Sequence, residues 1–226
     1  MDVELTKELF AEAAHSNEKG LHGHSYRIEI AVEGKTDPAL GWLIDYGDIK
    51  AAVAPLHAQL DHHFLNEVDD MMDTSLAGVR AWILERLAPK LECLKDVRVS
   101  IVGDCAFRPV ECPPDKAAGL PARVRFTFEA AQSLPHLAEG HPCRRLHGHT
   151  YRIGVGAENL GTLIEPLRTL YEALDHRFLN EIPGLEAATS ERLCEWIWQR
   201  LSANVAGMSV VVVQETGTAR CIYHGR

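Results

Sequence analysis

The stretch LHGHSYRI at residues 21–28 recurs as LHGHTYRI at residues 146–153. Seven of the eight positions are identical, and the eighth exchanges serine for threonine. A second pair follows in the same order, because LDHHFLNE at 60–67 is matched by LDHRFLNE at 174–181. Repeated motifs in a fixed order indicate that two copies of one structural unit are fused in tandem.

The repeat divides the 226-residue chain into two domains. We expect the first domain over 1–107 and the second over 123–226, each near the size of about 110 residues at which a domain buries its own core. The segment 108–122 between them contains four prolines and a glycine, which break any regular pattern. This composition predicts a linker.

Composition and charge narrow the class of protein. A formal net charge of −9 argues against a nucleic-acid partner, which would need a basic face. No run approaches the roughly 20 apolar residues of a membrane helix, and the first residues lack the pattern of a signal peptide. The six cysteines form no CxxC pair, so we expect reduced thiols and a cytoplasmic location.

Each copy is expected to fold as an α+β unit. In the first copy, alternation of apolar and polar residues predicts strands, and apolar spacing of three and four predicts helices. The expected strands are 3–10, 25–33, 41–45 and 97–102, and the expected helices are 48–60 and 74–87. In the second copy the expected strands are 123–129, 151–157, 161–164 and 209–214, and the helices are 166–174 and 189–201. Each half is then an antiparallel sheet with two helices on one face.

The repeated HGH motif predicts a metal site in the first copy. His22 and His24 stand two apart on a strand, so both imidazoles point to the same face. Gly23 between them permits close backbone approach, and His15, near the end of the first strand, supplies a third nitrogen. Three histidines with an open position are typical of catalytic zinc. An isolated HxH pair is more often packed or on the surface, but the third histidine and the duplication favour zinc.

The second copy keeps only part of this set. His147 and His149 are present, but Gln132 stands where the repeat expects the first histidine. A glutamine oxygen is a poor zinc ligand, so a second site at Gln132, His147 and His149 is weakened or empty unless His136 or His141 substitutes. We therefore expect about one zinc per chain.

Longer motifs point to a known family. The string QSLPHLAEGHPCRRLHGH at 132–149, with LDH at 174–176, TSE at 189–191 and QET at 214–216, resembles the 6-pyruvoyltetrahydropterin synthase / 6-carboxy-5,6,7,8-tetrahydropterin synthase family. The resemblance covers both halves, as a tandem duplication. It implies two tunnelling-fold (T-fold) domains that assemble edge to edge into a barrel, with active sites at subunit interfaces.

The resemblance also implies a set of proton-transfer residues. Cys143 matches the family's cysteine, and Asp61 with His62 and Asp175 with His176 match an Asp-His pair contributed by a neighbouring unit. A carboxylate raises the basicity of an imidazole, which would then hold Cys143 as a thiolate. A thiolate or imidazole near zinc can remove a proton from carbon beside a polarised oxygen. The structural alternative for each Asp-His pair is a helix cap or a surface pair.

Pterin recognition is implied at the end of the second copy. Glu215 matches the family's buried carboxylate, which would accept hydrogen bonds from the ring N–H and amino group. Glu191 matches a second acidic contact, with Thr189 and Ser190 beside it as substrate-binding residues. The alternatives are a solvated strand end and an acid at a helix N-terminus. In the first copy, Asp104 stands in place of Glu215.

Neither copy holds a complete set, whereas the two together do. We expect composite sites between a first and a second domain, in one chain or between chains, acting as a lyase on 7,8-dihydroneopterin triphosphate or a relative in queuosine-precursor or tetrahydropterin synthesis. A trimer of two-domain chains would imitate the hexamer of single-domain relatives. The residues expected to attract the triphosphate are Arg27, Arg144, Arg145 and Arg152.

Two alternatives remain open from the sequence. Glu18 stands four residues before His22, where the second copy has Cys143, and some family members with glutamate there cleave the dihydroneopterin side chain to a 6-hydroxymethylpterin. The other alternative is a degenerate, non-catalytic domain that binds a pterin or purine.

Overall fold

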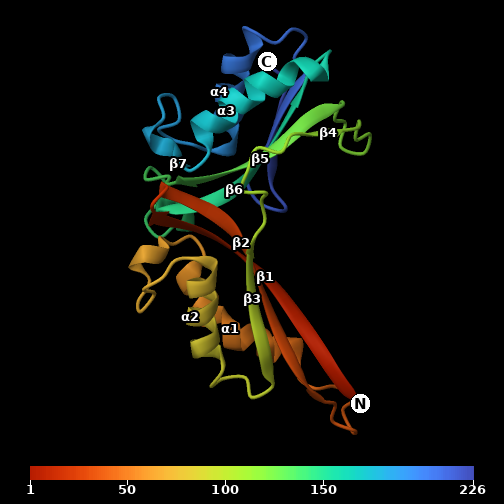
Figure 1. The fold of residues 1–226 in the computed structure, drawn as a ribbon, viewed down its shortest axis with the longest axis vertical. Coiled ribbons are helices and arrows are strands. Elements are labelled where there is room, and N and C mark those ends of the chain that lie inside the picture. Colours follow the sequence, from red (N-terminus) through yellow and green to blue (C-terminus); the bar gives the residue numbers. More distant parts are fainter.

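The first domain is built on a long β-hairpin. In the computed structural model, which describes residues 1–226, β1 (Asp2–Asn17) pairs along its whole length with β2 (Gly20–Lys35), and β3 (Leu94–Ile101) pairs with the other edge of β2. Helices α1 (Tyr46–Leu60) and α2 (Leu76–Leu87) cover one face of this antiparallel sheet, and a 3₁₀ helix at Leu65–Glu67 follows α1 (Figure 1).

The second domain repeats this arrangement with a larger sheet. Its central strands are β5 (Arg123–Gln132) and β6 (His147–Gly156), and β8 (Val210–Gln214) and β9 (Arg220–Tyr223) extend it. The short strands β4 (Val110–Cys112) and β7 (Arg177–Phe178) both pair with β5. The helices are α3 (Ile164–Leu174) and α4 (Ser190–Ser202), with 3₁₀ turns at Pro142–Arg144, Leu160–Leu163 and Leu179–Glu181.

Each domain has its own hydrophobic core. In the first, Ile28 and Ile30 of β2 pack in one cluster with Trp82 of α2. In the second, Ile153 of β6 packs in a separate cluster with Trp196 of α4. Two separate clusters mean that each copy buries its own apolar face, as the repeat predicted. None of the helices is both long and apolar enough to span a membrane.

The predicted α+β class, with one antiparallel sheet and two helices per copy, is confirmed. Two predicted strands are wrong, and two short strands were not predicted. Residues 41–45 form no strand, because β1 continues to Asn17 and is itself the hairpin partner of β2. Residues 161–164 end a 3₁₀ helix and begin α3 rather than forming a strand. The supposedly irregular linker contains β4, and β9 was not predicted.

The two domains meet through the ends of their central hairpins (Figure 1). Gly23 and Gly148 cross there so closely that a Cβ atom added to either glycine would collide with the Cα atom of the other. Beside them, the Ser25 N–H donates to Thr150 Oγ1 at 3.1 Å, and the Thr150 N–H donates to Ser25 Oγ at 3.1 Å. The paired HGH segments are thus related by a local two-fold arrangement, like the self-complementary interface of a symmetric dimer.

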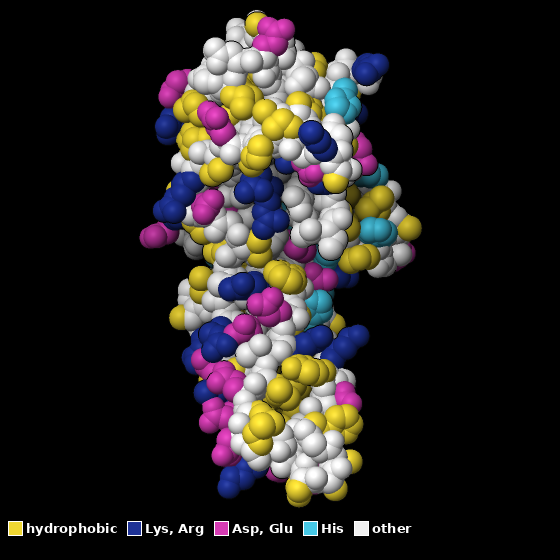
Figure 2. All heavy atoms as spheres, turned by 90° about the vertical axis from the view of Figure 1, so that its right-hand side faces the viewer, with side chains coloured by type: hydrophobic (Ala, Val, Ile, Leu, Met, Phe, Trp, Pro, Cys, Tyr) yellow, Lys and Arg dark blue, Asp and Glu magenta, His cyan; other side chains and the backbone are white.

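The sheet of the first domain has a charged face opposite its helices. Glu29 pairs with Arg98 across β2 and β3, and Lys95 pairs with both Glu4 and Glu33. Figure 2 shows acidic and basic side chains mixed along the lower part of the molecule. Because these pairs are largely exposed, each contributes at most about 1 kcal/mol to stability.

Candidate active site

Three histidines of the first domain converge near the turn of the β1–β2 hairpin. His15 and His22 are paired residues in the strand register, and His24 lies two residues further along β2. Nε2 of His15 lies 3.0 Å from Nε2 of His22 and 3.2 Å from Nε2 of His24. Burial lowers their pKa values, to about 4 for His15 and to about 3 for the other two. The three rings, called the cage below, are neutral at physiological pH.

The outer nitrogen of each cage ring has a hydrogen-bond partner. The distances are 3.2 Å from His15 Nδ1 to Thr74 Oγ1, 3.0 Å from His22 Nδ1 to the Gly20 carbonyl and 2.9 Å from His24 Nδ1 to Glu129 Oε2. A carbonyl only accepts, so His22 carries its proton on Nδ1 and turns its Nε2 lone pair toward His15. Glu129 in its ionised form fixes the same tautomer of His24.

This donor set fits a zinc ion. Lone pairs facing one another at such a separation repel unless a proton on His15 Nε2 or a cation lies between them. Tetrahedral zinc with bonds of about 2.0–2.1 Å keeps its nitrogens about 3.3 Å apart, close to the separations in the cage. The three histidines predicted from the sequence as metal ligands are therefore brought together.

An Asp-His pair from the second domain lies against the cage. The ring centroid of His176 is 4.3 Å from that of His22. Asp175 holds His176 Nδ1 at 2.6 Å through one carboxylate oxygen and accepts the Glu129 N–H at 2.9 Å through the other. Burial raises the pKa of Asp175, but the hydrogen bonds from His176 and from the Glu129 N–H outweigh burial and keep it below its usual value. His176 has a φ of 55°, a strained backbone conformation typical of functional positions.

The same arrangement recurs with the domains exchanged. Gln132 pairs with His147 in the strand register, as His15 pairs with His22. The ring of His62, from the first domain, lies 4.7 Å from that of His147, and Asp61 holds His62 Nδ1 at 3.0 Å. His62 also has a φ of 55°. We call Gln132, His147 and His149 the second cluster.

An ion pair fills the centre of the second cluster. Glu215 lies 3.2 Å from His149 Nε2, accepts a hydrogen bond from the Gln132 amide and accepts another from Ser190 Oγ at 2.9 Å. Glu12 lies 2.8 Å from the other nitrogen of His149. Burial alone would lower the pKa of His149, but hydrogen bonds to Glu12 and Glu215 raise it to about 9. Burial would raise the pKa of Glu215, but His149 lowers it to about 2.

The second cluster therefore holds an imidazolium where the cage presents lone pairs. The loss of a third imidazole at Gln132 fits the expectation of a weakened site. The two proposed substitutes do not replace it, because His136 and His141 are both exposed and His141 Nδ1 accepts a hydrogen bond from the Cys143 N–H instead.

The predicted acid/base residues divide between the two sites. Cys143 lies with His62 and His147, their ligand atoms within 4.8 Å of one another. Burial and the nearby Glu215 raise the pKa of Cys143, which favours the thiol, and a thiolate held by an Asp-His pair stays a prediction. Glu18 is exposed in the turn between β1 and β2, on the hairpin that carries the cage.

The predicted pterin contacts lie around the second cluster. Ser190 bonds Glu215 directly. Thr189 caps α4 through the Arg192 N–H, and Glu191 is exposed in the first turn of that helix, as in the structural alternative. Because Glu215 contacts Gln132 and His149, one chain does not bring this acid to the cage. A cage completed by Glu215 from another chain stays a prediction.

Two buried acids of the site escape prediction from the sequence. Glu12 and Glu129 occupy the same place in the two copies, three residues before His15 and Gln132. Each reaches across the interface, Glu129 to His24 and Glu12 to His149. Burial raises the pKa of Glu129 to about 8, and a cation in the cage would favour its ionised form. The sequence feature that could have revealed these two residues is an acid at the same place, on a core-facing stretch, in both copies.

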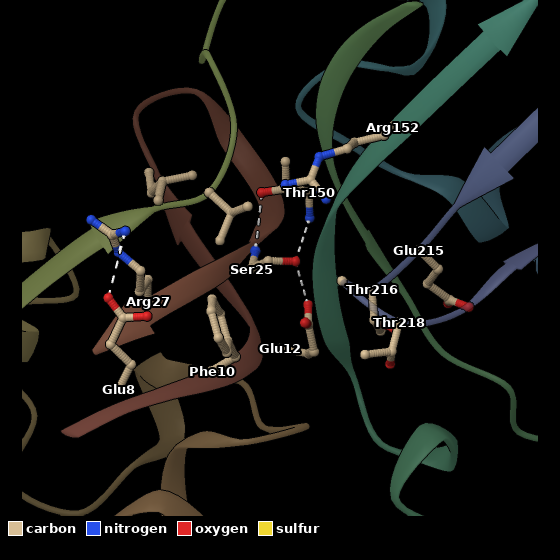
Figure 3. Close-up of a pocket in the computed structure, with 13 residues that line it drawn as sticks. Glu8, Phe10, Glu12, Ser25, Arg27, Thr150, Arg152, Glu215, Thr216 and Thr218 are labelled. Atoms are coloured by element: carbon tan, nitrogen blue, oxygen red, sulfur yellow. Dashed lines mark hydrogen bonds and ion pairs between the residues drawn. The ribbon is translucent and has the colours of Figure 1, made fainter. Parts of the chain in front are cut away.

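A cavity of about 730 Å³ opens where the domains meet (Figure 3). Glu215 and the loop after it line one side, and the equivalent arginines Arg27 and Arg152 line the others. Two of the four predicted cationic residues therefore face this cavity. The other two donate to backbone carbonyls, Arg144 to Leu137 and Arg145 to His62.

Comparison with known proteins identifies both halves. The family model described as 6-pyruvoyl tetrahydropterin synthase matches residues 5–105 and 122–226. The 6-carboxy-5,6,7,8-tetrahydropterin synthase of Synechocystis is 39% identical over an alignment of 117 residues, which covers 43% of this chain and 88% of that protein. The dihydroneopterin monophosphate aldolase of Pyrococcus furiosus is 34% identical over 71 residues, which are 31% of this chain and 59% of that protein.

Among solved structures, 6-pyruvoyl tetrahydropterin synthase of Caenorhabditis elegans superposes with a TM-score of 0.42 at 19% identity, covering 45% of this chain and 90% of that one. The two separate matches to one family model agree with the internal repeat. The chain therefore belongs to the 6-pyruvoyl tetrahydropterin synthase family and joins two of its T-fold domains in tandem.

Proposed function

We propose that the chain is a zinc-dependent lyase acting on 7,8-dihydroneopterin triphosphate or a relative, like the 6-carboxy- and 6-pyruvoyl-tetrahydropterin synthases. One observation supports the proposal. The donor set of the cage fits zinc, and the ring centroid of its His22 lies 4.3 Å from that of His176, which Asp175 of the second domain holds. A Lewis-acid site beside an oriented imidazole is what proton removal next to a carbonyl or hydroxyl requires.

The residues of the chain have distinct roles in this proposal. Zinc in the cage would polarise a side-chain oxygen of the substrate and so acidify the adjacent carbon. Asp175 holds His176 by Nδ1, which leaves Nε2 to accept and return the proton. The paired oxygens of Glu215 would accept from the pterin ring in place of His149 and Gln132. Arg27 and Arg152 in the cavity would attract the phosphate chain.

We infer a second candidate function, which is cleavage of the substrate side chain to a 6-hydroxymethylpterin. Cys143, which matches the cysteine of the synthases, lies beside His147 of the second cluster, whereas Glu18 lies on the hairpin of the cage. The relative from Pyrococcus furiosus named as an aldolase supports this candidate. In this version Glu18 and His176 share the proton transfers, and Cys143 takes no part.

Incubation of the zinc-loaded protein with 7,8-dihydroneopterin triphosphate tests the proposal, with the product identified by mass spectrometry. A tetrahydropterin product that disappears in Cys143→Ala supports the synthase. A 6-hydroxymethylpterin that disappears in Glu18→Gln supports side-chain cleavage. Binding of the pterin without turnover, with the cage loaded, would show a non-catalytic binding domain instead.

The proposal includes a trimer of two-domain chains. The edge strands of the first sheet are β1 and β3, and those of the second are β4 and β9, so each of them pairs with a neighbouring strand on one side only. Such open edges pair readily with another chain. Neighbouring chains around a ring would then bring Glu215 of one chain to the cage of the next.

Mixing two inactive variants tests this arrangement. His22→Ala removes a cage ligand and Glu215→Gln removes the anchor, so each variant alone is expected to be inactive. After dissociation and joint reassembly, about a quarter of the wild-type activity should return, because random neighbours then combine an intact cage with an intact anchor. Recovery of no activity in mixed oligomers would mean that the cage and the anchor of a working site come from the same chain.

A further inference from the structure

Three potential ligands meet at the domain junction outside the cage. They are His62 of the first domain and Cys143 and His147 of the second, and their ligand atoms lie within 4.8 Å of one another. His147 is fully buried, and the other two are partly buried. His62 and His147 have no role in the chemistry proposed at the cage, and Cys143 has none in the version that uses Glu18 and His176.

His147 is hydrogen-bonded on its outer nitrogen as metal ligands usually are, and His62 has a carboxylate oxygen within ion-pair distance of its outer nitrogen. His147 donates from Nδ1 to the Arg145 carbonyl at 2.7 Å, and His62 Nδ1 lies 3.0 Å from Asp61 Oδ2. A hydrogen bond from the outer nitrogen to a carbonyl or carboxylate fixes the tautomer that leaves Nε2 free to coordinate. Arg145 Nε also donates to the His62 carbonyl at 2.8 Å, which fastens the two ligand-bearing loops together.

The three residues equivalent to the cage do not offer such a set. His149 is hydrogen-bonded to Glu12 through Nδ1 and lies within ion-pair distance of Glu215 through Nε2, and Gln132 replaces the third imidazole. Gln132 is fully buried, and its Oε1 has no hydrogen-bond partner. A buried polar atom left without a partner costs about 1–3 kcal/mol, so it marks a place where a polar or charged group belongs.

We propose that His62, Cys143 and His147 form a second metal site, which takes zinc or another thiophilic divalent cation and joins the two domains. Two imidazoles and one thiolate are a donor set that zinc favours. Binding releases the thiol proton to solvent, as metal binding to cysteine does. This site goes beyond the proposed lyase activity, and it raises the expected metal content from one to about two ions per chain.

Cobalt(II) provides a specific readout, because thiolate coordination gives an intense sulfur-to-cobalt charge-transfer band in the near ultraviolet that imidazole ligands alone do not give. Titration of the metal-free protein with cobalt(II) should produce this band and reach two ions per chain. In Cys143→Ser the band should vanish and the stoichiometry should fall to one. Cys105→Ser removes an exposed cysteine and serves as the matched control, which should keep both.

A second variant separates this site from the cage. His22→Ala should lose one ion but keep the charge-transfer band, whereas His147→Ala should lose the band. A wild-type protein without the band, or a band that survives Cys143→Ser, would overturn the second site and leave the cage untouched. If the cage fails instead, wild type and His22→Ala will bind the same single, thiolate-ligated ion.

Discussion

The variant His176→Asn is expected to lower turnover by about 10²–10⁴-fold, the usual contribution of a positioned general acid or base. Asparagine suits the test because it tolerates the positive φ of this position. It cannot accept and return a proton as imidazole does. The cage ligands are untouched, so zinc content should stay at the wild-type value.

Steady-state kinetics with metal analysis on the same samples check this expectation. His57→Asn is a matched control, since His57 is half-buried on α1, away from the cage, and its ring bonds only the Phe10 carbonyl. It should retain wild-type kcat. A larger loss in His62→Asn than in His176→Asn would move the chemistry to the second cluster.

Much of the fold follows from the sequence because its large apolar residues keep a strand or helix period over long stretches. Apolar residues of β2 fall on every second position, and those of α2 and α4 fall on one helical face. The mistaken strand at 41–45 is also apolar, but Trp42 and Leu40 lie exposed in a loop. Short apolar runs do not reveal which strand will occupy a sheet edge, because that depends on pairing far along the chain.

The metal ligands could be predicted for a similar reason. His15, His22 and His24 lie on one hairpin, so local register alone brings them together. The position of Glu215 could not be predicted, because the arrangement of the two domains decides which histidines it meets. Replacement of one imidazole by Gln132 then lets Glu215 pair with a protonated His149.

The reciprocal acids Glu12 and Glu129 show the same limit. Within its own strand, each of them is an acid on a stretch that faces the core, where a carboxylate is rarely buried without a partner. Their partners become visible only when the two hairpins cross at Gly23 and Gly148. A motif search along one copy cannot find a contact that the other copy supplies.

Glu129→Gln is expected to weaken zinc binding at the cage by about 10–100-fold, the usual effect of losing a residue that orients a metal ligand. Glu129 Oε2 lies 2.9 Å from His24 Nδ1 and also accepts from Thr150 Oγ1 at 2.6 Å. The carboxylate fixes the proton of His24 on Nδ1 and stabilises the positive charge of the metal. An amide of the same shape removes that charge, and its NH₂ group can favour the tautomer that blocks Nε2.

The two-fold arrangement supplies the control for this variant. Glu12→Gln removes the equivalent contact to His149, which serves no cage ligand. Zinc affinity should be measured by competition with a chelator in the Cys143→Ser background, so that only the cage is titrated. Glu12→Gln should then bind zinc as the background protein does. Equal losses in both variants would mean that the acids act by holding the domains together, because only Glu129 contacts a cage histidine.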